Sequence, residues 1–155
     1  MIVQWEPVLK DVISEVLETM FFAFVDFEDE DSGAESFDYE SRICLFNHTG
    51  RMEISLNVSS GFARMITANF LGINEDQVGE EDIKDSLKEL TNMVGGGYHV
   101  RASNTDYELG IPSAWKVADR ERTDIPKEEA GMYFGCFGEP VGSALLKFMP
   151  DGKCS

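Results

Sequence analysis

The stretch that decides the fold is Asp85–Val100, DSLKELTNMVGGGYHV, which we predict to lie within a helix over residues 80–101. Apolar residues recur along it every three or four positions, which is the spacing of one buried helical stripe. The members of this stripe are Ile83, Leu87, Leu90 and Val94. The stripe predicts that one side of the helix faces the core of the domain.

Three polar residues of the same helix, Asp85, Glu89 and Asn92, are also spaced at helical period. At about 100° per residue, they fall within roughly 60° of one another. Their mean direction lies about 160° from the apolar stripe, so two carboxylates and one amide face away from the core. Asparagine is a mediocre helix former, and burial gives no reason to place one there.

Gly96 follows Asn92 by one turn on the same face, within a run of three glycines at 95–97. A glycine inside a helix costs about 1 kcal/mol relative to alanine, so the run suggests that something approaches the helix backbone closely. Two interpretations are open. Either this face docks a partner and presents Glu89 and Asn92 to it, or it is a solvated face whose glycines let a neighbouring helix or strand pack tightly.

Composition and charge limit the class of protein. A chain of 155 residues with 43% hydrophobic residues is typical of one globular domain, here residues 1–155. The formal net charge of −16 argues against nucleic acid and anionic membranes as partners. The sequence predicts neither a transmembrane helix nor a signal peptide. Cys44, Cys136 and Cys154 form no Cys-x-x-Cys pair, and we expect reduced thiols in a cytoplasmic protein.

The rest of the chain predicts two further helices and several hairpins. A wide apolar stripe predicts a first helix over residues 6–24. A short helix is predicted over residues 61–71, with Ser60 as its N-cap and Gly72 after its end. Alternating apolar residues or hairpin composition predict strands at 41–46, 52–58, 111–117, 131–137 and 141–149.

Residues 26–40 are strongly acidic, and we predict a solvated loop that leads into a strand and is dispensable for folding. A calcium-binding loop of EF-hand type is a more specific alternative. The residue spacing of the segment does not fit such a loop, because with Gly33 as the obligatory glycine the twelfth position is Tyr39 rather than glutamate. A second charged loop is predicted over residues 119–129, and the tail 151–155 should fray.

The order of predicted elements is helix, two strands, short helix, long helix and three strands. Strands joined in hairpins and flanked by helices indicate an α+β fold. We therefore expect a mainly antiparallel sheet with two long helices packed on one face.

The motif Asp85-x3-Glu89-x2-Asn92, on a helix after a hairpin and a short helix, resembles the signature of the CheC/CheX/FliY phosphatases of bacterial chemotaxis. That signature places Asp or Ser four residues before Glu and seven before Asn, with a proline roughly twenty residues on, here Pro112. The order of elements matches over about residues 40–150. The sequence contains no second Glu-x-x-Asn, so it resembles CheX rather than the two-site CheC.

The resemblance implies a CheX-like enzyme that dephosphorylates the aspartyl phosphate of a response regulator such as CheY. Asn92 would hold the attacking water, Glu89 would pair with a lysine of the regulator, and Asp85 and Gly96 would belong to the docking face. The regulator would bring its own Mg²⁺, so no cofactor or metal is expected in this chain. The resemblance also implies a homodimer that pairs through sheet edges, for which residues 131–149 are the candidates.

Two other hypotheses stay open. One is a non-catalytic docking or oligomerisation module of the same fold, such as a flagellar switch domain or a signalling scaffold. The other is an unrelated α+β domain in which the motif arises by chance. The position of Asn92 in the structure tests these hypotheses. If Glu89 and Asn92 are exposed side by side, the phosphatase and the docking module are both supported. If Asn92 is buried in the core, the chance motif is supported instead.

Overall fold

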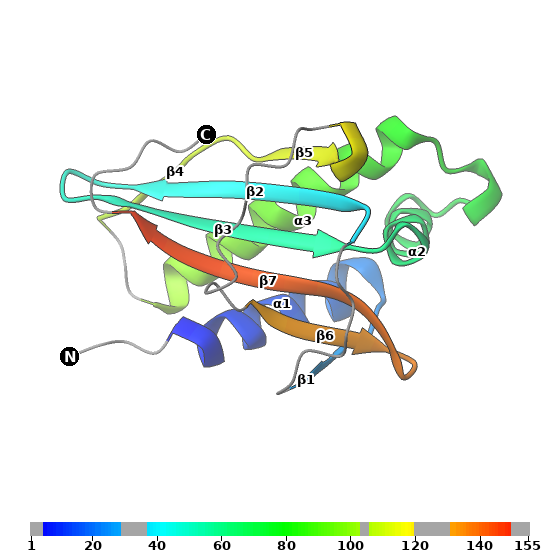
Figure 1. Cartoon of the computed structure of the whole chain (residues 1–155), viewed down its shortest axis with the longest axis horizontal. Coiled ribbons are helices and arrows are strands. Elements are labelled where there is room, and N and C mark those ends of the chain that lie inside the picture. The colour runs from blue at the N-terminus through cyan, green and yellow to red at the C-terminus, as the bar shows by residue number, and fades with distance from the viewer. Residues whose placement is uncertain (1–4, 29–36, 103–105, 120–130, 150–155) are drawn as a thin grey trace.

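The computed structural model describes residues 5–28, 37–102, 106–119 and 131–149 of the chain. In these ranges the two long helices pack behind one face of an antiparallel sheet, and a shorter helix stands at one end of it (Figure 1). The helices are α1 (Trp5–Phe21), α2 (Ser60–Leu71) and α3 (Glu80–Arg101). The predicted α+β fold is confirmed, and α3 has the bounds predicted for the long helix over residues 80–101.

The sheet contains seven strands in the described part of the chain, and every pairing is antiparallel. Their order is β1-β6-β7-β3-β2, and both β4 and β5 pair with the outer side of β2. The strands are β1 (Asp26–Glu28), β2 (Tyr39–Phe46), β3 (Arg51–Val58), β4 (Glu108–Leu109), β5 (Ser113–Lys116), β6 (Met132–Cys136) and β7 (Glu139–Met149).

Two tight turns set the register of the predicted hairpins. In the turn between β2 and β3, the Asn47 side-chain oxygen accepts a hydrogen bond from the backbone N–H of Gly50 at 3.0 Å. Between β6 and β7 the chain turns at Phe137 and Gly138, whose φ angles are 53° and 78°. Two successive residues with positive φ are the geometry of a type I′ hairpin turn, which matches the twist of the strands.

The core lies between the sheet and the helices and forms one cluster of buried side chains. The predicted stripe of α3 belongs to it, since all four members are at most 1% exposed. Burying this stripe fixes which face of α3 is turned to solvent, because residues half a turn away must then point outward.

The first helix ends three residues earlier than the sequence predicts. Phe22 adopts a left-handed conformation with φ 53°, and the N–H of Ala23 folds back to the carbonyl of Leu17 at 2.9 Å. This is the closure of a Schellman-type helix end, here without a glycine. The apolar residues continue at helical spacing as far as Phe24, and for this reason the sequence pattern predicts a helix that is too long.

The short helix confirms its predicted end but not its predicted cap. Gly72 takes the left-handed conformation at φ 69°, and its N–H bonds to the carbonyl of Ala68. The N-cap is Ser59 rather than Ser60, because the Ser59 hydroxyl accepts the N–H of Phe62. Of two adjacent serines, the sequence does not reveal which one takes the extended backbone of a cap.

The predicted acidic loop over residues 26–40 is wrong at both ends. Asp26–Glu28 form β1, which pairs with β6, and Tyr39 already pairs with β3. Phe27 gives the reason for the first strand, because its ring lies 5.5 Å from the ring of Phe134 in the core. Deleting the whole segment would remove β1 and the first two residues of β2, so the expectation that it is dispensable does not hold for its ends.

The sheet edges also differ from expectation. β6 lies between β1 and β7, and β7 lies between β6 and β3, so the strands within 131–149 do not offer the edges expected for a dimer. The strand predicted at 111–117 is β5, which starts directly after Pro112 and lies beside β2 near the other edge. A proline at the entry to an edge strand is consistent with its missing N–H.

Some expectations lie outside the described residues, namely the middle of the 26–40 segment, the second charged loop beyond Asp119 and the tail 151–155. The expectation for the cysteines is wrong at Cys44, which is disulfide-bonded, whereas Cys136 is a buried free thiol. Burial raises the pKa of the Cys136 thiol, so this side chain behaves as a small apolar group of the core.

Candidate functional site

The candidate site is the outward ridge of α3, which we define by Asp85, Glu89, Asn92 and Gly96. The three side chains of this ridge are exposed, and Gly96 is half-buried. In the described part of the chain, Asp85 and Glu89 form no ion pair with another residue. The structure thus places the predicted residues side by side on one helix face, and Asn92 is not buried in the core.

A buried hydroxyl pair beneath the ridge fixes the rotation of α3. Thr91, the neighbour of Asn92, is 0% exposed, and its Oγ1 lies 2.5 Å from the Oγ of Ser41 on β2. A buried hydroxyl that loses its hydrogen bond is destabilising, so the pair favours one rotation and one height of the helix on the sheet. Because Thr91 points into the core, the adjacent Asn92 points towards solvent.

The start of α3 is tied down at two points. The Asp82 carboxylate accepts the backbone N–H of Gly79 at 2.9 Å, which caps the helix. Lys116 of β5 lies 3.3 Å from the carboxylate of Glu80, and this hydrogen bond raises the pKa of Lys116. These contacts hold the ridge on a rigid helix rather than on a loop.

The glycine run of α3 is explained mainly by packing within the protein. A Cβ at Gly95 would lie 3.0 Å from a side chain of β2, and a Cβ at Gly97 would lie 2.8 Å from Val12 of α1. A Cβ at Gly96 would meet Leu109 of β4 at 3.9 Å, which is ordinary contact. The two interpretations of the run therefore apply to different residues: close packing explains 95 and 97, and the ridge contains 96.

These distances predict opposite effects for two neighbouring substitutions. Gly97→Ala should lower the free energy of unfolding by about 1 kcal/mol or more, because its Cβ overlaps the buried Val12. Gly96→Ala should raise it by up to about 1 kcal/mol, because alanine favours the helix and meets no overlap. Urea denaturation of both variants measures the difference. Shifts of the same sign would contradict this packing.

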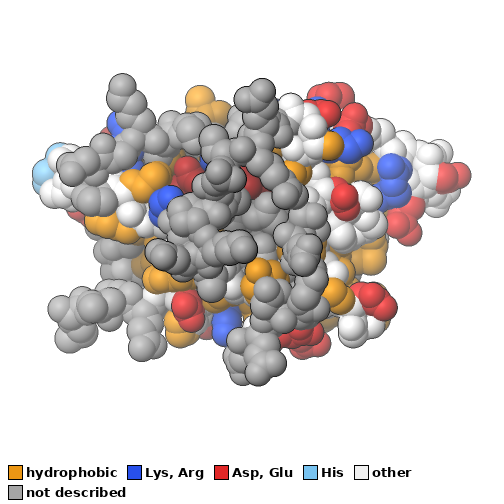
Figure 2. All heavy atoms as spheres, viewed as in Figure 1, with side chains coloured by type: hydrophobic (Ala, Val, Ile, Leu, Met, Phe, Trp, Pro, Cys, Tyr) orange, Lys and Arg blue, Asp and Glu red, His pale blue; other side chains and the backbone are white. Residues whose placement is uncertain are grey.

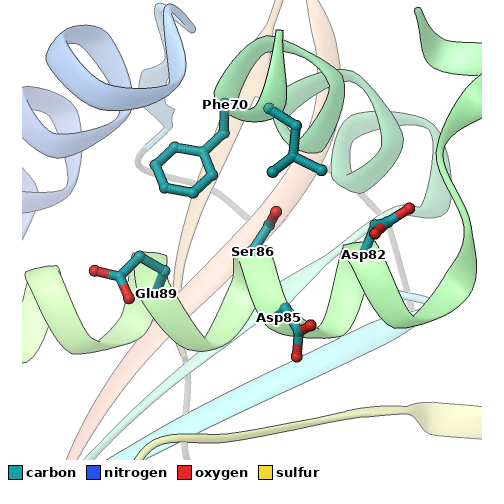
Figure 3. A pocket seen from close by; sticks show the side chains of 6 residues that line it. Phe70, Asp82, Asp85, Ser86 and Glu89 are labelled. Atoms are coloured by element: carbon teal, nitrogen blue, oxygen red, sulfur yellow. The ribbon is translucent and has the colours of Figure 1, made fainter. Parts of the chain in front are cut away.

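A hollow of about 290 Å³ lies beside the ridge, between α3 and the last turn of α2 (Figure 3). It is lined by Phe70, Leu71, Asp82, Asp85, Ser86 and Glu89. In Figure 3 the Ser86 hydroxyl points from α3 towards α2, with Glu89 and Asp82 on either side of it. Asn92 lies about one turn beyond Glu89 and is not part of the lining.

Sequence reasoning found the ridge but missed this hollow. The lining from α2 comes from a separate helix, so no spacing within the sequence of α3 indicates it. One weak signal was present: Leu71 stands at the end of the α2 stripe, directly before the helix-ending glycine, where an apolar side chain is left 45% exposed. The contribution of Ser86 is visible only when α2 is in place.

The net charge of the whole chain favours a partner with a basic surface. The chain has 29 acidic against 13 basic residues. Acidic and basic side chains stand side by side at the end of the molecule where α2 passes into α3 (Figure 2).

In the described part of the chain, no helix is long and apolar enough to cross a membrane.

The chemistry available on the ridge is that of an amide and carboxylates. An amide both donates and accepts hydrogen bonds, so Asn92 can hold a water molecule. Carboxylates accept hydrogen bonds from cations, so Asp85 and Glu89 can hold a lysine or arginine. Among the described residues, no group of three or more His, Cys, Asp or Glu side chains could hold a metal ion.

Comparison with protein families matches residues 43–134, more than half of the chain and including all of α3, to the model described as "Chemotaxis phosphatase CheX". Comparison with curated proteins gives no match.

Three solved structures share the fold. CheX from Vibrio vulnificus has 20% identity and a TM-score of 0.74, with 94% of this chain and 97% of that chain covered. CheX from Desulfovibrio desulfuricans has 16% identity and a TM-score of 0.74, with 94% and 99% covered. The CheX–CheY–BeF3–Mg²⁺ complex from Borrelia burgdorferi has 13% identity and a TM-score of 0.74, with 96% and 99% covered.

Proposed function

Since this chain belongs to the CheX family of chemotaxis phosphatases, we propose that its α3 ridge dephosphorylates the aspartyl phosphate of a CheY-type response regulator. Glu89 and Asn92 are the proposed catalytic residues. The observation that carries the proposal is their exposure about one turn apart on a helix that is packed against the sheet. Side chains on a rigid, protruding helix face can enter the active site of a partner without rearrangement of this chain.

The proposed role of Asn92 is to orient the attacking water. The water oxygen bonds to phosphorus while the bond between phosphorus and the aspartate oxygen breaks. The products are a free carboxylate and dihydrogen phosphate, which keeps both protons of the water. An acyl phosphate already has a good leaving group, so fixing the water in line supplies much of the catalysis. A neutral amide can accept from this water without repelling the phosphoryl oxygens.

The proposed role of Glu89 is to fix the docking register. Its carboxylate is exposed and has no ion pair in the described part of the chain, so it is available to a lysine of the regulator. Asp85 extends the same face one turn towards the start of the helix. Gly96 follows Asn92 without a side chain, which keeps the ridge low where the partner backbone would approach.

We propose that the regulator supplies the Mg²⁺. The Borrelia burgdorferi complex contains CheX, CheY, BeF3 and Mg²⁺, which is the analogy for this proposal. The ridge then acts on a phosphoryl group whose charge is already partly balanced on the partner side, and this chain contributes no metal ligand. A regulator of this type places the proposed activity in the cytoplasm.

We also propose a homodimer, with a corrected edge. The edges of the sheet within the described residues are the three-residue β1 on one side and β4 with β5 on the other. Two of the three residues of β1 are acidic, so strand pairing between copies is more favourable along the four-residue β5. Sedimentation at micromolar concentration should show a dimer, and a monomer would count against this pairing.

The proposed activity is tested by the lifetime of the acyl phosphate. Response regulators of the source organism are phosphorylated with acetyl phosphate in Mg²⁺, freed of excess donor, and followed by phosphate release with and without this protein. We expect the protein to shorten the half-life of its cognate regulator and to leave unrelated regulators nearly unchanged. An unchanged half-life across all of these regulators would contradict the proposal.

A further inference from the structure

We infer that the hollow between α2 and α3 binds a second basic side chain of the regulator, separate from the lysine that Glu89 is proposed to hold. The inference rests on the proposed function, because it takes the regulator as the partner that covers the ridge. It assigns a docking role to Leu71 and Ser86, which the motif does not include, and a specific one to Asp85.

The hollow has both an apolar wall and a charged rim. Phe70 and Leu71 line the hollow on the α2 side, and the acidic residues Asp82, Asp85 and Glu89 line it on the α3 side. A lysine or arginine has the same two parts, an apolar stem and a cationic head. The stem would pack on Leu71, which is 45% exposed, while the head would meet the rim.

Ser86 is the observation that points to a ligand rather than to a merely acidic surface. Its residue is 2% exposed, yet its hydroxyl lines the hollow and points towards α2 (Figure 3). In the described part of the chain this hydroxyl has no hydrogen-bond partner. Because Ser86 is almost completely covered by the protein, an occupant of the hollow that donates to this hydroxyl would give it the hydrogen bond that it lacks within the described residues.

The wall of the hollow is held in place before any partner arrives. Phe70 stacks on Phe21 of α1 with ring centroids 4.8 Å apart, and the Asn69 amide donates to the carbonyl of Phe21 at 3.0 Å. Because these contacts join the ends of two helices, the hollow needs little reorganisation to bind, which favours affinity.

The position of the hollow separates its occupant from the lysine beside the phosphoryl group. It begins at Glu89 and extends back to Asp82, about 10 Å along α3 at the helical rise. This direction leads away from Asn92, where the chemistry is proposed. The occupant therefore comes from the regulator surface around its active site, and it affects which regulator docks rather than how fast the phosphate leaves.

A basic side chain fits the hollow better than a metal ion does. Among the described residues, the acidic side chains of the rim do not form a group of three that could hold a metal ion. A long organic cation can reach one carboxylate at a time while its stem stays on the apolar wall. With a net charge of −16 on this chain, the same contact also steers a basic regulator surface towards the ridge.

The test is steady-state dephosphorylation of the cognate phosphorylated regulator by three variants. Asp85→Asn should raise KM about five- to tenfold at low salt, with less effect at high salt and with kcat changed less than about twofold. Leu71→Ser should raise KM without this salt dependence. Ser86→Ala should raise KM while the protein becomes no less stable in urea, because the hydroxyl that it removes forms no hydrogen bond within the described part of the chain.

Glu81→Gln is the matched control. It makes the same change of charge on the same helix, but the Glu81 side chain is 84% exposed and does not line the hollow. Its KM should stay at the wild-type value. Replacing each lysine and arginine of the regulator by alanine should identify one residue whose loss is not made worse by Asp85→Asn, as a double-mutant cycle requires.

The outcomes distinguish this inference from the proposed function. A wild-type protein that dephosphorylates the regulator, with unchanged KM in Asp85→Asn and Leu71→Ser, overturns the hollow and leaves the catalytic proposal standing. Equal changes in Asp85→Asn and Glu81→Gln also overturn it, since the effect would then be a general loss of charge. A wild-type protein without activity on any regulator overturns the proposed function, and this inference with it.

Discussion

Asn92→Ala is expected to lower kcat for regulator dephosphorylation by about 100-fold or more, with little change in affinity for the regulator. An amide that orients water acts on the transition state, where its loss removes the in-line geometry of attack. It contributes little to docking, because the ridge keeps its carboxylates. Single-turnover phosphate release at saturating enzyme measures the rate, and titration against the regulator with BeF3 and Mg²⁺ measures the affinity.

The fold should tolerate this substitution. Asn92 is exposed, and surface changes usually stay within about 0.5 kcal/mol, so the melting curve should be nearly unchanged. Asn92→Asp is the informative companion, since it keeps the size but adds a negative charge that faces the phosphoryl oxygens. It should be as inactive as alanine. A stable Asn92→Ala protein with wild-type turnover would contradict the proposed mechanism.

Glu89→Ala is expected to lower kcat/KM by roughly 10- to 100-fold, with the loss shared between KM and kcat. The carboxylate is proposed to hold a regulator lysine, so its loss weakens docking and also lets the remaining complex settle in the wrong register. The defect of kcat/KM should shrink as salt rises, because salt already weakens the same contact in the wild-type protein. The Asn92→Ala defect should lack this salt dependence.

Glu89→Gln controls for shape. It keeps the length of the side chain and one accepting oxygen but removes the charge, so it should reproduce most of the alanine defect. Activity near the wild-type value in Glu89→Gln would show that an ion pair is not the basis of docking. A large loss of thermal stability in Glu89→Ala would instead show that this side of α3 packs against the rest of the protein and is not exposed to a partner.

The ridge could be predicted from sequence because it depends on one helix alone. Its position follows from the 3.6-residue period and from a long apolar stripe, and both are local properties of residues 80–101. The same locality explains why the hairpins were recovered, since Asn47 and Gly138 supply turns whose geometry depends on adjacent residues. The α+β class followed from the order of these elements.

The errors arose where distant parts of the chain decide the structure. A single aromatic residue, Phe27, makes a strand of an acidic segment because Phe134 lies opposite it. The pairing of β1 with β6 in turn removes an edge that the C-terminal hairpin would offer in isolation. The hollow needs Leu71 and Ser86 from two helices, and neither residue indicates it alone.

The measurement that tests the central claim most directly is phosphate release with this protein present at about one tenth of the concentration of its phosphorylated regulator. The claim is that the ridge is catalytic, so each molecule should discharge many regulators and the whole acyl-phosphate pool should decay faster than it does alone. A non-catalytic docking module of the same fold could at most alter the one tenth that it binds. Decay of the pool at the rate of the regulator alone, with binding still detectable, would contradict the claim.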